Sequence, residues 1–231
     1  MRILALETSG LSGSVALLDD QRGFEFSCEL AAGQRSAQAL APAIHDALKS
    51  TGWSPRELEA VAVTVGPGSF TGLRIGVTTA KTLAYAIGAA IVGVNSLDVL
   101  AAAIPPSDAR LWALLDAHRS ELFAASYRVN TAGDWIREDA TRECSLPTVD
   151  AWLAQLAPGD IVTGPVLAKL ASRLPSGVIA AAEELRSPQA RYVARLAAKR
   201  LAAGERDDVW NLVPFYGRLS AAEEKRLATD A

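Results

Sequence analysis

The sequence predicts an α/β protein of two similar lobes, each a mixed sheet with helices. Short apolar segments alternate with segments of helical periodicity. The order of elements in the first half recurs in weaker form in the second, and a Pro-Pro pair at residues 105–106 separates the halves. Because 50% of the 231 residues are hydrophobic, the chain can fill more than one core.

The first half begins with three expected antiparallel strands. Residues 3–6 and 14–18 are short apolar segments around a polar turn, and residues 24–28 alternate apolar and polar side chains. A helix with one apolar face follows from about residue 36 to 49. A strand over 61–65, a helix from about 71 to 86 and a strand over 90–94 complete this half.

The second half predicts a smaller sheet. Strands are expected over 111–115, 121–129 and 134–137, and helices over 149–156 and 166–174 flank a strand at 160–163. Ser187 and Pro188 have the pattern of a cap and first position of a helix that ends before Gly204. We expect a first lobe of residues 1–105 and a second of 106–187, with the helix 188–203 and the tail 204–231 packing back toward the first.

Charge and cysteine content limit the function classes. The formal net charge is −3 and the basic residues are scattered, so the chain itself offers no basic surface for nucleic acid. Cys28 and Cys144 lie far apart and form no CxxC pair, which indicates neither a zinc ribbon nor a disulfide framework. The first apolar run ends at Glu7, too short for a signal peptide, so a cytoplasmic protein without membrane contact is expected.

The segment from Val61 to Gly76 is the most informative part of the chain. A β-prone strand leads into Gly66-Pro67-Gly68, and Ser69 or Thr71 can cap the next helix. Such a turn suits a phosphate or a partner, but the lysine and Ser/Thr of a Walker motif are missing. Small residues then recur every four positions, which fits either packing within the lobe or a subunit interface; they are Gly72, Gly76, Ala80 and Ala84.

Few residues are arranged for catalysis. A metal site needs several correctly spaced ligands, and the two histidines, His45 and His118, lie on separate segments in different predicted lobes. No GxSxG motif surrounds Ser69, and neither histidine is placed to form a triad with it. We therefore expect no metal site and no protease chemistry, and we interpret Ser69 as a helix cap.

Several segments together resemble one family, TsaB, also called YeaZ. They are residues 4–9, 66–76, 92–97, 116–123 and 214–218. The resemblance implies the actin-like, sugar-kinase-like ASKHA fold of two lobes. It also implies a non-catalytic, cofactor-free subunit needed for N6-threonylcarbamoylation of the tRNA adenosine 3′ to the anticodon. A TsaD-like subunit then performs the transfer, a TsaE-like ATPase joins the assembly, tRNA is met only through the complex, and the chain alone forms a homodimer.

The resemblance also bears on nucleotide binding. ASKHA kinases usually have an aspartate and small polar residues around the nucleotide phosphates where this chain has Glu7, Thr8 and Ser9. The longer Glu7 side chain would displace a metal-bound phosphate. We expect a vestigial nucleotide site of these three residues with Gly66 and Gly68. The alternative is a small ATP-binding ASKHA enzyme that transfers phosphoryl or carbamoyl groups, or a protease-like paralogue.

The same resemblance favours a subunit interface for the small-residue strip, because the family pairs through helices of the first lobe. The expected contacts lie on the helices at 38–48 and 71–83; they are Leu40, Ile44, Leu48, Gly72, Leu73, Gly76, Val77, Ala80 and Leu83. A bulky residue at Gly76 is expected to abolish the heterodimer and leave a folded monomer.

Overall fold

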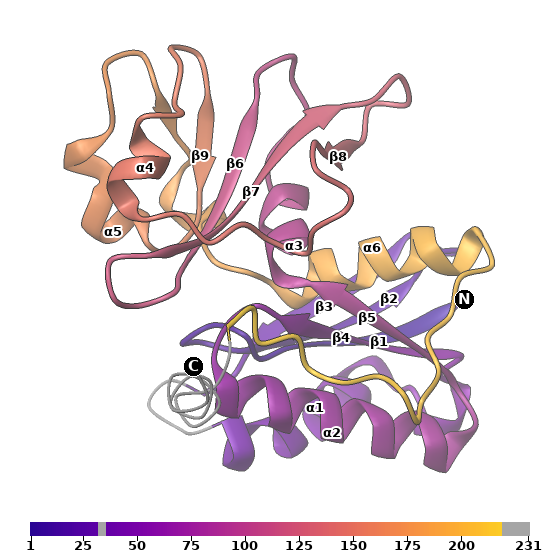
Figure 1. Ribbon diagram of the computed structural model, residues 1–231. Coiled ribbons are helices and arrows are strands. Elements are labelled where there is room, and N and C mark those ends of the chain that lie inside the picture. Colours follow the sequence, from indigo (N-terminus) through magenta and orange to yellow (C-terminus); the bar gives the residue numbers. More distant parts are fainter. Residues whose placement is uncertain (32–35, 219–231) are drawn as a thin grey trace.

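A computed structural model describes residues 1–31 and 36–218 and shows two lobes stacked one above the other (Figure 1). Each lobe is built on a five-stranded sheet. The first lobe contains strands β1 to β5, and the second contains β6 to β10. The α/β fold of two lobes that the sequence predicts is therefore confirmed.

The first sheet has the strand order β3-β2-β1-β4-β5. β1 pairs antiparallel with β2 and parallel with β4, β2 pairs antiparallel with β3, and β4 pairs parallel with β5. The three opening antiparallel strands are as predicted. The strands are β1 (Arg2–Glu7), β2 (Ser14–Asp19), β3 (Phe24–Glu29), β4 (Ala60–Gly66) and β5 (Ala90–Asn95).

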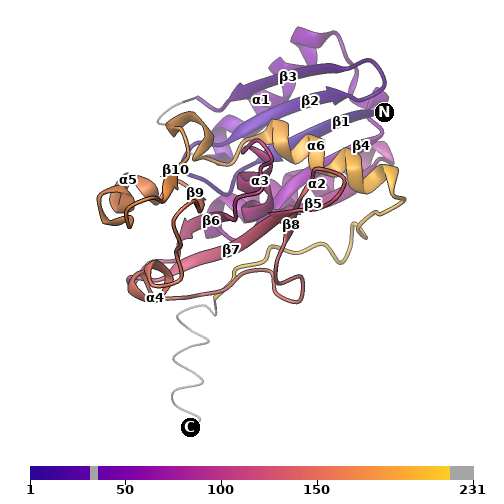
Figure 2. The ribbon, with the colours of Figure 1, turned by 90° about the horizontal axis from the view of Figure 1, so that it is seen from above.

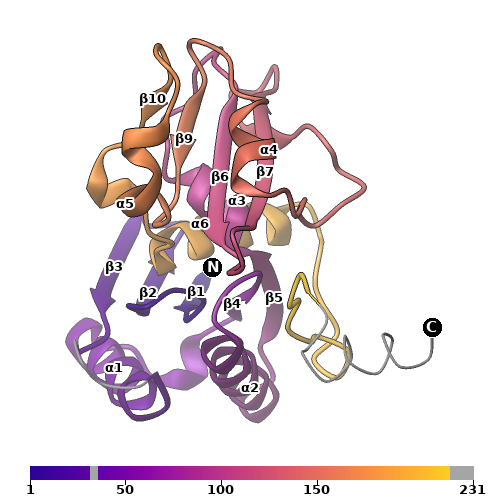
Figure 3. The same cartoon turned by 60° about the vertical axis from the view of Figure 1, so that its left-hand side comes forward.

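Helices cover both faces of the first sheet. α1 (Ser36–Thr51) and α2 (Phe70–Ile87) lie on one face and α6 (Ala190–Ala202) on the other (Figure 3). Side chains alternate along β1, so Leu4 and Leu6 join the core on the side of α1 and α2, whereas Ile3 and Ala5 join the core under α6. A short 3₁₀ helix (Pro55–Glu57) precedes β4.

The two predicted helix caps have different outcomes. Ser69 caps α2 as predicted, because its hydroxyl accepts the Gly72 amide at 3.2 Å. The predicted cap at Ser187 is wrong. α6 begins at Ala190, its N-cap is Gln189, and the Ala190 amide instead donates to the Ser14 hydroxyl at 2.9 Å. A tertiary contact therefore replaces the local cap.

The second sheet repeats the plan of the first. Its order is β10-β9-β6-β7-β8, where β6 pairs antiparallel with β7 and parallel with β9. The outer pairs are β7 with β8, antiparallel, and β9 with β10, parallel. β6 thus occupies the place of β1. The strands are β6 (Leu111–Asp116), β7 (Leu122–Val129), β8 (Trp135–Arg137), β9 (Ile161–Thr163) and β10 (Ile179–Ala180).

Shorter helices cover the second sheet. α3 (Ser96–Ala102) packs on one face, and α4 (Val149–Leu153) and α5 (Leu167–Leu170) pack on the other (Figure 2). The sequence pattern did not predict α3 or β10, and the helix expected over 149–156 is longer than α4. The helix expected over 166–174 corresponds to α5 and the 3₁₀ turn that continues it. Two more 3₁₀ segments, Ala171–Arg173 and Glu183–Leu185, follow α5 and β10. No described helix has both the length and the apolar character that a membrane span needs.

The tail after α6 returns along the first lobe (Figures 1 and 3). Asp207 forms an antiparallel bridge with Ile91, at the outer edge of β5. The Lys81 ammonium on α2 donates to the carbonyl oxygens of Trp210 and Leu212 at 3.1 and 3.0 Å. Residues 219–231 of the predicted tail lie outside the described part of the chain.

Candidate functional site

The turn after β1 carries the acidic residue expected at a nucleotide site. Glu7 ends β1, and its side chain is completely buried. Its Oε1 accepts the Ser9 amide at 2.7 Å, the Ser9 hydroxyl, and the Thr64 hydroxyl at 3.5 Å. Among the described residues, none gives Oε2 a hydrogen bond of normal geometry. The carboxyl group is therefore closed off from solvent and bonded mainly through one oxygen.

Burial changes the acidity of this group. Removal from water raises the pKa of Glu7 from 4.5 to about 7, and hydrogen bonds from Ser9, Gly10 and Thr64 offset part of that rise. The neutral and ionised forms are therefore both populated near neutral pH. A carboxylate that binds the metal ion of a metal-phosphate complex must be ionised and accessible, whereas Glu7 is fully buried and only partly ionised near neutral pH.

The glycine-rich turn packs directly on this acidic turn. The Ser69 amide donates to the Ser9 carbonyl oxygen at 2.8 Å. A Cβ built on Gly68 would lie 2.6 Å from the same oxygen, and one on Gly72 would lie 2.0 Å from the Thr8 carbonyl oxygen. The glycines therefore permit backbone contact within the lobe, and atoms of this chain occupy the space that a phosphate cradle would leave open.

The predicted nucleotide residues thus lie together without forming an open site. Glu7, Thr8, Ser9 and Gly66 are all buried, and Gly68 is half-buried. A Cβ on Gly66 would lie 2.0 Å from the carbonyl oxygen of Phe215, so the tail covers this glycine. The sequence indicated which residues meet at this point, but it gave no signal that the tail would cover them.

Metal-ligating side chains do not gather in the described part of the chain, where no group of three or more His, Cys, Asp or Glu could hold a metal ion. His45 is exposed on α1, and His118 is exposed on the turn between β6 and β7. The two histidines therefore lie in different lobes, as the sequence predicted.

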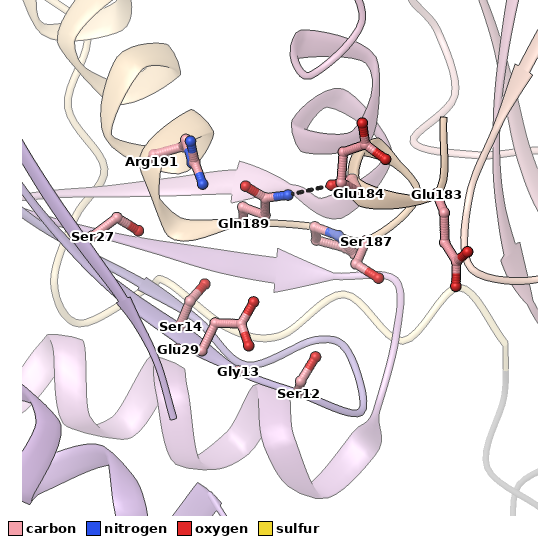
Figure 4. Close-up of a pocket in the computed structure, with 11 residues that line it drawn as sticks. Ser12, Gly13, Ser14, Ser27, Glu29, Glu183, Glu184, Ser187, Gln189 and Arg191 are labelled. Atoms are coloured by element: carbon pink, nitrogen blue, oxygen red, sulfur yellow. Dashed lines mark hydrogen bonds between the residues drawn. The ribbon is translucent and has the colours of Figure 1, made fainter. Parts of the chain in front are cut away.

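A small cavity of about 160 Å³ lies beside the tip of the β1–β2 hairpin (Figure 4). Serines 12, 14 and 27 and Glu29 line one side, and the segment 183–191 lines the other. Gln189 donates to the Glu184 carbonyl oxygen at 2.7 Å across that segment (Figure 4). Three carboxylates and a single arginine line this cavity, so it repels phosphate, and it is smaller than ordinary ligand pockets of ~300–1,000 Å³.

A larger groove of about 1060 Å³ lies between the lobes, among β5, α3, β8 and α6, and the sequence did not reveal it. Its charged side chains neutralise one another. Arg137 pairs with Asp98 at 2.6 Å, and Lys199 pairs with Asp134. Asn95 adds a contact between the lobes by donating to the Glu143 carboxylate at 2.8 Å.

The nine residues predicted for a partner interface lie inside the lobe. All except Leu83 are buried, and Leu83 packs partly buried against the same core. A Cβ on Gly76 would lie 2.2 Å from the Thr8 hydroxyl oxygen, so the small-residue strip packs within its own lobe. The expectation for Gly76 must be corrected, because a bulky residue there would disturb the fold. The spacing identified the apolar faces of both helices, and these faces turn toward their own sheet.

Comparisons with known proteins identify the family to which the chain belongs. It is 32% identical to the Bacillus subtilis "tRNA threonylcarbamoyladenosine biosynthesis protein TsaB", over 97% of each chain. The Escherichia coli protein of the same name is 30% identical over 97% of this chain and 98% of its own. The chain belongs to the TsaB family. A structure of YeaZ from Pseudomonas aeruginosa superposes on this TsaB-family protein with a TM-score of 0.77 and 27% identity, over 93% and 99% of the two chains.

The TsaB-family chain is also related to a transferase family. The model for TsaD, tRNA N6-adenosine threonylcarbamoyltransferase, matches residues 29–172. The transferase of that name from Anaeromyxobacter dehalogenans strain 2CP-C is 33% identical over 54% of this chain and 43% of its own length. The matched region contains α1 and α2, so the transferase family shares sequence with the two helices that cover the outer face of the first sheet.

Proposed function

We propose that this protein is a non-catalytic subunit of the tRNA threonylcarbamoyladenosine machinery that docks on a TsaD-like catalytic subunit. A TsaE-like ATPase joins this pair, and this chain interacts with tRNA only indirectly, through the complex. The names of the full-length relatives support the pathway. The acidic turn supports the accessory role, because Glu7 is fully buried and the neighbouring glycines pack against the chain's own carbonyl groups.

The outer face of α1 and α2 is the proposed docking surface. Since the inner faces of these helices pack on the sheet, a partner must contact the exposed side chains; they include Ala41 and His45 on α1 and Arg74, Thr78, Thr82 and Tyr85 on α2. Ala41, Thr78 and Thr82 are small, so a helix of the partner can approach closely at these positions. A standard interface buries ~1,600 Å² in total, of which two helices supply a plausible share.

The relation to TsaD supports a pseudo-symmetric pair. The transferase model matches the residues that form α1 and α2. Two related chains can therefore meet helix pair to helix pair, in the way that identical subunits use one patch on both sides of a two-fold axis. The same surface in two copies of this chain would give the expected homodimer.

The test inserts charge into this surface without disturbing the core. Ala41→Arg and Thr78→Arg each place a large cation on an exposed position of α1 or α2. We expect each variant to keep its melting temperature within a few degrees and to lose the complex with the TsaD-like subunit in size-exclusion chromatography. The matched control is Ala202→Arg, which is exposed on α6 at the opposite face of the sheet. Unchanged complex in both test variants would contradict the docking surface.

Reconstitution tests the accessory role itself. The purified chain with tRNA, threonine, bicarbonate and ATP is expected to give no modified nucleoside, and modification should appear only with the TsaD-like subunit and the other components of the machinery. The two docking variants should lower the yield in the full mixture, whereas Ala202→Arg should not. Modification by this chain alone would show that it is an enzyme and would overturn the proposal.

A further inference from the structure

We propose that residues 215–218 form a strap that pins the two lobes to each other and holds the turn between β6 and β7 in a strained conformation. The strap lies at the end of the described tail, after the segment that runs along α2 (Figure 1). Its first two residues contact the first lobe, and its last two contact the second. The proposal concerns the internal mechanics of this chain and stands independently of any partner.

The strap is fixed to the first lobe by backbone and side-chain contacts. The Phe215 amide donates to the Val65 carbonyl oxygen at 2.7 Å, next to the glycine-rich turn. The Tyr216 hydroxyl accepts the Arg74 Nε at 2.9 Å, and the Tyr216 ring lies 4.7 Å from the Phe70 ring. Backbone and side chain therefore both hold this end of the strap on β4 and α2.

The other end of the strap reaches the second lobe. Gly217 has a φ of 67°, and a Cβ on it would lie 2.6 Å from the Phe123 ring, so only glycine suits this close approach. Arg218 donates from Nη1 to the Ala117 carbonyl oxygen at 2.9 Å, and its Nη2 pairs with the Glu121 carboxylate. One guanidinium thus bridges both ends of the β6–β7 turn with charge-assisted bonds.

The turn between those two anchor points is strained. His118, Arg119 and Ser120 have φ values of 62°, 50° and 62°, so three consecutive residues with side chains occupy the left-handed region. Residues of this kind rarely adopt that conformation, and it persists only where the surroundings enforce it. Within the turn, the Glu121 amide donates to the His118 carbonyl oxygen at 2.9 Å. Arg218 adds a brace from outside the turn.

A second contact between α6 and the second lobe lies away from the strap. Lys199 pairs with Asp134, which precedes β8 at the opposite end of β7 from Phe123. Two lobes of one chain are expected to move relative to each other unless the contacts between them are extensive. Because the strap provides contacts at the other end of β7, its loss is expected to free both the turn and the relative motion of the lobes.

The experiment measures trypsin cleavage after Arg119 and hydrogen exchange of residues 116–121 in the full-length chain. In Arg218→Ala we expect cleavage and exchange to rise about tenfold, because two charge-assisted bonds to the turn are lost. Arg218→Lys keeps the positive charge but loses the planar, forked guanidinium that bonds to both ends of the turn. An intermediate rise in cleavage and exchange is therefore expected. The control is Arg128→Ala, which removes an exposed pair with Glu138 in the same lobe and should change neither quantity.

Truncation separates the strap from the residues that follow it. A chain that ends at Val213 lacks the strap, and it should show faster cleavage and a larger radius of gyration in small-angle scattering than a chain that ends at Arg218 and keeps the strap. If the shorter truncation fails to fold, Arg218→Ala still decides the question. Unchanged cleavage and exchange in Arg218→Ala, with a folded far-ultraviolet spectrum, would overturn the proposal.

Discussion

Glu7 and Asp116 occupy the same position in the two lobes and have opposite surroundings. Each ends the strand that pairs antiparallel with the next strand and parallel with a later one. Glu7 is fully buried, and burial raises its pKa to about 7. The Asp116 side chain is 37% exposed. Partial burial acts to raise its pKa, but hydrogen bonds from Lys169 and the His118 amide outweigh that effect and hold it below 3.8.

The difference shows that neighbours, and not sheet topology, set the chemistry of such a turn. In the first lobe the residues after the parallel strand are glycines that let α2 press on the turn, so solvent is excluded. In the second lobe the corresponding helix, α5, presents Lys169, which pairs with Asp116 at 2.9 Å in partial contact with water. One turn is therefore fixed by packing and the other by charge. Three substitutions test this contrast.

Gly72→Ala should have the largest effect, because it attacks the packing of the first turn. The new Cβ would lie 2.0 Å from the Thr8 carbonyl oxygen, which belongs to the buried backbone and cannot move freely. We expect a loss of about 3–5 kcal/mol in the free energy of unfolding, measured with urea. The control is Gly88→Ala at the end of the same helix, where the added Cβ meets no atom within 4 Å but the φ of 70° costs about 1 kcal/mol. Equal losses at the two glycines would contradict this account.

Glu7→Gln should remove a pH-dependent loss of folding stability that originates in the first turn. Because the folded-state pKa of about 7 exceeds the ordinary value of 4.5, the folded protein binds this proton more tightly than the unfolded chain does. The stability that protonation contributes is complete below pH 4.5 and is lost as the pH rises through 7. The glutamine variant cannot ionise, so it should be more stable than the parent at pH 8, by up to about 3 kcal/mol, and similar at pH 4.5.

Urea unfolding at several pH values between 4.5 and 8 checks this prediction. Glu29→Gln, which removes the carboxyl group of an exposed glutamate on β3, serves as the matched control. Parallel profiles for the parent and Glu7→Gln would mean that Glu7 does not carry the raised pKa.

Much of the fold could be predicted from the sequence because it depends on local patterns. Alternation in 24–28, the apolar run 61–65 and the cap at Ser69 each depend on near neighbours, and the structure confirms them. α3 was missed because it is short and buried on most sides, so it shows little periodicity. The helical spacing placed Leu40 and Leu73 on the apolar faces of their two helices. Whether those faces contact a sheet or a partner depends on contacts distant in sequence. The cover of Gly66 by Phe215 depends on residues about 150 positions apart and has no local signal.

Lys169→Ala should have the smallest effect, since it removes an ion pair that water already screens. The Lys169 side chain is 74% exposed, so we expect a loss of at most about 0.5–1 kcal/mol at neutral pH, and less in high salt. Because the pKa of Asp116 is lowered in the folded state, this contribution is present above the ordinary pKa of 3.8 and disappears as the pH falls below it. Urea unfolding at pH 7 and pH 3 measures both quantities. A loss above 2 kcal/mol that salt does not reduce would mean that the second turn, like the first, depends on packing, and the contrast between Glu7 and Asp116 would then be one of degree.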